Sequence, residues 1–93
     1  MSRQSELIKR RRNELGLTYE DVARKVFNTD KPRPSQLVTI YGWESGRLKR
    51  GVCPKRVRAL CDTLFIDLDD MIYDMAMDYK DRLREFNPKV DNA

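Results

Sequence analysis

Apolar residues recur at three- and four-residue spacing in five segments of the chain, a pattern typical of amphipathic helices. Residues that favour helix termini stand at the ends of these segments. We expect Ser5 to cap a first helix that runs to Leu15 and stops at Gly16. A second helix is expected to start at the cap Thr18 and to continue through Val26.

Three further helices are expected over residues 36–45, 54–64 and 68–86. Ser35 is the predicted cap of the first of these, Pro54 suits the first position of the second, and Asp67 is the predicted cap of the third. A short strand is the competing interpretation for residues 37–41, which are rich in β-branched side chains. The capped start and the glycine stop around them favour a helix.

Charge divides the chain into a basic part and an acidic part. Residues 1–58 hold 15 Lys/Arg against 6 Asp/Glu, whereas residues 59–93 hold 4 against 9, within a net charge of +4. A basic first part indicates contact with a polyanion such as nucleic acid. Scattered solvated charge is the alternative, because 37% of the residues are charged.

The chain offers little chemistry for an enzyme. It has no histidine, and its two cysteines, Cys53 and Cys61, are too few for a zinc site and are expected to be reduced thiols. We therefore expect a protein without catalytic activity, metal or cofactor. No apolar run is long enough to span a bilayer and the first residues do not resemble a signal peptide, so a cytoplasmic location is expected.

The motifs resemble those of the lambda repressor and Cro superfamily, also called the XRE family. The resemblance is carried by Leu17-Thr18 with Ala23, by Thr39-Ile40-x-x-Trp43-Glu44-x-Gly46, by Pro54-x-x-Val57-x-x-Leu60-Cys61-x-x-Leu64, and by Ile66-x-Leu68-x-Asp70-Met71. It implies an all-α, five-helix helix-turn-helix domain over residues 1–72. In this family the third helix enters the major groove, and dimers read palindromic sites.

The sequence departs from the family pattern in three places. A loop of about seven residues is inserted between the second and third helices, with Phe27 where the family has a glycine. Two prolines and the run Asn28-Thr29-Asp30 lie in this loop. Arg11 occupies a position usually held by leucine, and the fifth helix is unusually long.

Candidate DNA contacts surround the third helix. Base readout is expected from Gln36, Val38, Thr39 and Tyr41, because a glutamine amide can pair with adenine and aliphatic methyl groups can pack on the thymine methyl. Phosphate contacts are expected from Arg10, Tyr19, Lys31, Arg33, Arg47, Lys49 and Arg50. Solvated surface is the alternative for each of these cations. The resemblance also implies an ion pair between Arg12 and Glu44 that orients the third helix.

The fifth helix carries more apolar residues than one small domain needs. Its predicted stripe comprises Met71, Ile72, Met75, Ala76, Tyr79, Leu83 and Phe86. We expect residues 73–88 to extend the helix and form a homodimer interface, followed by a disordered tail over residues 89–93. A helix that folds back along its own domain is the alternative.

Together these patterns predict a sequence-specific regulator of transcription that binds double-stranded DNA. A dimeric repressor of a phage or mobile element, reading a palindromic operator, is the leading interpretation. An antitoxin-type DNA-binding protein, whose last helix binds a protein partner, is the first alternative. The second is a protein-interaction module whose basic surface is incidental.

Overall fold

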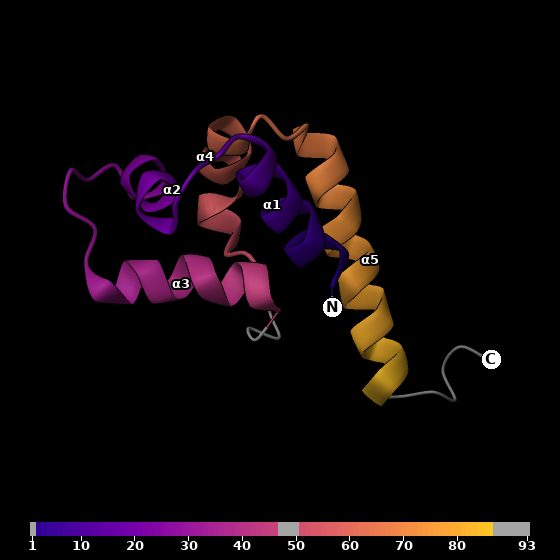
Figure 1. The fold of residues 1–93 in the computed structure, drawn as a ribbon. Helices are drawn as coiled ribbons and strands as arrows, with labels where there is room; N and C mark the ends of the chain where they lie inside the picture. The colour runs from indigo at the N-terminus through magenta and orange to yellow at the C-terminus, as the bar shows by residue number, and fades with distance from the viewer. Residues whose placement is uncertain (1, 47–50, 87–93) are drawn as a thin grey trace.

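The computed structural model describes residues 2–46 and 51–86, without the side chains of the last two. These residues form five helices and contain no strand, which confirms the all-α prediction. The helices are α1 (Arg3–Glu14), α2 (Tyr19–Val26), α3 (Pro34–Ser45), α4 (Pro54–Leu64) and α5 (Leu68–Phe86). In Figure 1, α1 lies between α3 and α5, and it packs against both.

Three of the predicted helix starts are confirmed. Thr18 caps α2, and its backbone N–H donates in return to the Asp21 carboxylate at 2.9 Å. Pro54 is the first residue of α4. Asp67 caps α5, because one of its carboxylate oxygens accepts hydrogen bonds from the backbone N–H groups of Asp69 and Asp70.

Two predicted caps are wrong. The first helix begins earlier than expected, because the hydroxyl of Ser2 accepts a hydrogen bond from the Ser5 backbone N–H and caps α1 in its place. The third helix begins at Pro34 rather than after Ser35, and its capping position is Arg33. Proline lacks the N–H that the first helical position leaves unpaired, so the helix can start at Pro34, two residues sooner than expected.

A single apolar core joins the five helices. Its fully buried side chains include Ile8 of α1, Val22 of α2, Ile40 of α3, Leu60 of α4 and Met71 of α5. Arg11, at a position where the resemblance led us to expect leucine, is half-buried. Its Nε donates to the carbonyl oxygen of Leu64 at 3.2 Å, so it satisfies a backbone acceptor at the end of α4.

One apolar stripe was expected on α5, but its apolar residues form two rows. Met71 is fully buried, and Met75 is half-buried against the core. The Met71 side chain is therefore unavailable to a partner, contrary to the prediction, and Met75 is only partly exposed. The other row, which we call the outer row, consists of Ile72, Ala76, Tyr79 and Leu83, all of them exposed. The side chain of Phe86 and the predicted tail lie outside the described residues.

The acidic side of α5 holds the start of α1. The Asp78 carboxylate accepts hydrogen bonds from the backbone N–H groups of Arg3 and Gln4, at 2.9 and 3.1 Å, and from the Gln4 side-chain amide at 3.0 Å. Asp81 pairs with the Arg3 guanidinium at 2.9 Å. The helix is continuous across the predicted boundary at residues 72 and 73, and it lies along its own domain as far as Asp81. Its C-terminal end reaches beyond the other helices (Figure 1).

Candidate nucleic-acid interface

The outer face of α3 exposes a row of uncharged side chains. Pro34, Val38 and Tyr41 recur at helical spacing and face solvent, with 67% of Val38 and 42% of Tyr41 exposed. Ile40 and Trp43 point the other way, into the core. Two of the predicted base-reading residues, Val38 and Tyr41, are therefore on the surface that another molecule could approach.

The one acidic residue between positions 34 and 45 is turned away from this face. Glu44 is 3% exposed, and its two carboxylate oxygens accept hydrogen bonds from Nε and Nη2 of Arg12, both at 2.7 Å. A third N–H of this guanidinium donates to the Leu17 carbonyl oxygen at 2.8 Å. The hydrogen bond and charge of Glu44 raise the pKa of Arg12 above its ordinary value, although burial opposes the change.

This paired arrangement has two consequences for α3. A bidentate arginine–carboxylate contact restrains the rotation of α3 relative to α1, since both oxygens must stay aligned with the guanidinium. The negative charge of Glu44 is also neutralised inside the domain. The outer face of α3 consequently presents no carboxylate to an approaching polyanion.

Both ends of α3 have additional polar anchors. At the C-terminal end, the buried Ser5 hydroxyl donates to the Trp43 carbonyl oxygen at 2.6 Å. At the N-terminal end, Oε1 of Gln36 accepts from the Arg33 backbone N–H at 2.8 Å. The Thr39 hydroxyl donates to the Ser35 carbonyl oxygen at 2.9 Å. Gln36 and Thr39 therefore keep the amide N–H₂ and the methyl group, respectively, for contacts with a ligand.

An aromatic and cationic stack connects α3 to the start of α2. The ring of Tyr19 meets the ring of Tyr41 edge-on, with centroids 5.9 Å apart. The guanidinium of Arg12 lies 4.5 Å from the Tyr19 centroid on α2. Tyr19, a predicted phosphate contact, is thus half-buried and supports Tyr41 and Arg12 with its ring, while its backbone amide lies in the first turn of α2.

The inserted loop brings two predicted cations to the N-terminal end of α3. Lys31 and Arg33 are both exposed there. Asn28, which directly follows Phe27 at the end of α2, takes the left-handed conformation, with φ of 50°. Arg24 of α2 donates to the Asp30 carbonyl oxygen at 3.3 Å and fastens the loop to α2. Three further predicted contacts, Arg47, Lys49 and Arg50, lie outside the described residues.

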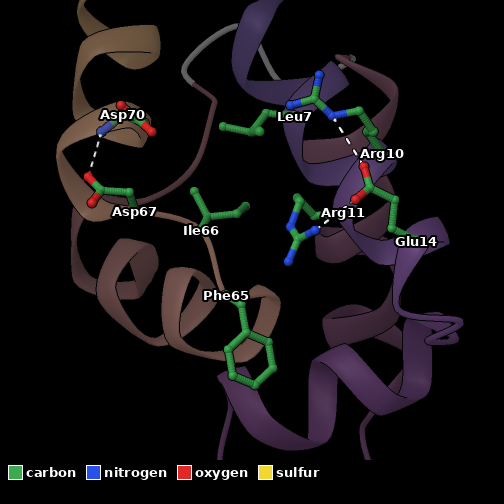
Figure 2. Close-up of a pocket in the computed structure, with 8 residues that line it drawn as sticks. All are labelled: Leu7, Arg10, Arg11, Glu14, Phe65, Ile66, Asp67 and Asp70. Atoms are coloured by element: carbon green, nitrogen blue, oxygen red, sulfur yellow. Dashed lines mark hydrogen bonds and ion pairs between the residues drawn. The ribbon is translucent and has the colours of Figure 1, made fainter.

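Arg10 lies away from this surface. It is two residues from Arg12, which places it about 200° around α1. It lines a pocket together with Phe65, Asp67 and Asp70, on the side of α1 that faces the connection between α4 and α5 (Figure 2). Its guanidinium approaches the Glu14 carboxylate at 3.5 Å. The structure therefore does not bring Arg10 together with the other predicted phosphate contacts.

Several residues at this site were not predicted from the sequence. Phe27 stacks on Trp43 with ring centroids 6.3 Å apart, and the guanidinium of Arg56 lies 4.9 Å from the Phe27 centroid. This stack links α2, α3 and α4 at the base of the inserted loop. The available signal was that Phe27 stands where the resemblance led us to expect a glycine. The contact between Ser5 and Trp43, 38 residues apart, had no local signal.

No family model matches the chain, and neither the curated proteins nor the solved structures give a significant match. Within the described ranges, no helix combines the length and apolarity needed to cross a bilayer. Those ranges also hold no group of three acidic, cysteine or histidine side chains that could bind a metal ion.

Proposed function

We propose that this protein binds double-stranded DNA sequence-specifically and regulates transcription, as a dimeric repressor that reads a palindromic operator. In this proposal α2 and α3 act as a helix-turn-helix of the lambda repressor and Cro type, with α3 in the major groove. The observation that supports it best is the outer face of α3. It is exposed and uncharged, and the one acid of α3, Glu44, is neutralised by Arg12.

Base readout in this proposal falls to the outer side of α3. Val38 packs on a thymine methyl, Tyr41 reaches a base edge or its sugar, and the methyl of Thr39 and the amide N–H₂ of Gln36 add contacts near the start of the helix. Lys31 and Arg33 meet phosphates beside that end, and the basic residues Arg47, Lys49 and Arg50 meet phosphates beyond the other. Arg12 and Glu44 touch no base and hold the angle of α3.

The second half of the proposal concerns the partner of α5. The exposed outer row of α5 is assigned to a second copy of the chain, which would supply the second half-site. The same row is the observation that favours the alternative, an antitoxin-type DNA-binding protein whose last helix binds another protein.

Selection of sites from random double-stranded DNA, followed by affinity measurements on the selected site, tests the readout. Tyr41→Ala should weaken binding to the selected site by roughly 1–3 kcal/mol and relax its consensus at particular positions. Tyr73→Ala is the matched control, because Tyr73 is an exposed tyrosine on α5. Unchanged affinity and consensus in Tyr41→Ala would remove α3 as the reading helix.

The inserted loop is tested through the salt dependence of binding. Lys31→Ala should weaken binding to all sequences alike and lower the slope of log K against log salt by about one unit, because one phosphate contact is lost. Arg10→Ala is the control, since Arg10 lies on the other side of α1. Equal slopes for Lys31→Ala and the wild type would show that the loop does not touch the DNA backbone.

A further inference from the structure

The outer row of α5 has the spacing of a coiled-coil seam. Its members Ile72, Ala76, Tyr79 and Leu83 are four, three and four residues apart. This alternation keeps one face of a helix against a partner helix over several turns. The row is exposed throughout, with 51% of Ile72, 55% of Tyr79 and 47% of Leu83 open to solvent. A second helix could therefore pack along it without disturbing the core.

We propose that the outer row packs against the outer row of a second copy in antiparallel orientation. In this register Ile72 of one copy faces Leu83 of the other, and Ala76 faces Tyr79. The two-fold axis passes between residues 77 and 78. The inference rests on the dimer of the proposed function and adds the orientation and register of the pairing.

Side-chain volume favours this orientation. A parallel pair would place each residue opposite itself, so a thin layer of two Ala76 side chains would lie beside a wide layer of two Tyr79 rings. The antiparallel register sets one small residue against one large residue in each of the central layers. The outer layers then pair isoleucine with leucine. All four layers have comparable width, which lets the helix axes stay at a constant distance.

Charge along the helix favours the same orientation. From residue 67 to residue 78 the chain has five aspartates and no cation, whereas residues 79–84 contain three cations and one aspartate. Antiparallel pairing places the acidic start of each α5 beside the basic end of the other, namely Lys80, Arg82 and Arg84. A parallel pair would set the acidic starts side by side. The helix dipoles also run in opposite directions in the antiparallel pair.

Disulfide cross-linking of the full chain measures the orientation. The background carries Cys53→Ser, because Cys53 is exposed whereas Cys61 is buried. Ile72→Cys and Leu83→Cys are made separately in this background and oxidised alone and as a mixture. The antiparallel register predicts a covalent dimer in the mixture and monomers from either variant alone. Covalent dimers from either single variant alone would show parallel pairing and overturn the proposal.

Light scattering completes the test. The wild type should be dimeric, Tyr79→Glu should be monomeric, and Tyr73→Glu, on the same helix outside the row, should remain dimeric. A monomeric wild type overturns the pairing, and this outcome includes the case in which the row binds a different protein. A wild-type dimer that Tyr79→Glu does not dissociate also overturns it. Binding of a single DNA half-site by Tyr79→Glu is measured separately. If neither this variant nor the wild type binds the half-site, the proposed DNA binding is refuted. The cross-linking result on the orientation of the dimer is not affected by that outcome.

Discussion

Helices α3 and α5 both expose apolar side chains, but they place their acidic residues differently. Glu44, the acid of α3, is 3% exposed and accepts hydrogen bonds from Nε and Nη2 of Arg12. None of the described acids of α5 is buried: Asp69 and Asp70 are exposed, and the half-buried Asp78 and Asp81 contact the start of α1. The α3 row has no exposed acid beside it and has Lys31 and Arg33 at its N-terminal end, which suits a polyanion, whereas a row bordered by aspartates suits a protein helix. The neighbours of each row, more than its hydrophobicity, distinguish the two surfaces.

The largest expected effect comes from breaking the buried ion pair that orients α3. Arg12→Ala should lower the free energy of unfolding by about 3 kcal/mol, because it strands the Glu44 carboxylate without its partner. Glu44→Ala should cost less, since the Arg12 side chain is 15% exposed and can turn toward water. Urea unfolding measures both variants.

The double variant Arg12→Ala/Glu44→Ala provides the control for this comparison. Neither charge is stranded in it, so it should be more stable than the sum of the single losses predicts. A double-mutant cycle with no coupling energy would show that the two groups act independently. The buried position of Glu44, which distinguishes α3 from α5, would then not depend on its ion pair with Arg12.

A smaller effect is expected where α5 holds α1. Asp78→Ala should lower the free energy of unfolding by about 1 kcal/mol, because two backbone N–H groups in the first turn of α1 and the Gln4 amide lose their acceptor. Urea unfolding of Asp81→Ala is the matched measurement. Both partners in its ion pair with Arg3 are 46% exposed, so the loss should be near zero. Equal losses in the two variants would contradict the anchoring role of Asp78.

The helices were predictable because their signals are local. Thr18, Pro54 and Asp67 each act on backbone groups within a few residues, so capping chemistry located the starts of three helices. The same reasoning gave wrong starts for α1 and α3. Ser2 and Ser5 are both reasonable caps, and the tertiary contact between the Ser5 hydroxyl and Trp43 accounts for the position that Ser5 takes.

The tertiary roles were harder to predict. Periodicity placed Met71 and Ile72 in one stripe, but neighbouring residues on a helix point about 100° apart, and only Met71 reaches the core. Asp78 acts on Gln4 and Arg3, which precede it in the sequence by 74 and 75 positions. The spacing of residues within a helix cannot predict such a distant partner. At the candidate site, Val38 and Tyr41 were placed outward by helical geometry. The hydrogen bond that Oε1 of Gln36 accepts from the Arg33 backbone N–H depends on the true start of α3, which the sequence analysis placed two residues too late.

The smallest expected effect concerns Asp74, on the side of α5 that faces α1. Burial raises the pKa of Asp74 above its ordinary value of 3.8, and the nearby carboxylate of Asp78 adds to the change. A carboxyl group with a raised pKa in the folded state contributes stability that is complete below pH 3.8 and is lost as pH rises through the folded-state pKa. Ionised Asp74 therefore opposes folding at neutral pH.

Asp74→Asn removes this ionisation with little change in shape. At neutral pH the variant should be more stable than the wild type by about 0.5 kcal/mol or less, measured by urea unfolding. The difference should vanish well below pH 3.8, where Asp74 is protonated in both folded and unfolded wild-type chains. The low-pH measurement is thus an internal control for packing effects of the amide. A variant less stable than the wild type at neutral pH would mean that the Asp74 carboxylate supports the contact between α5 and α1. Its role would then match that of Asp78.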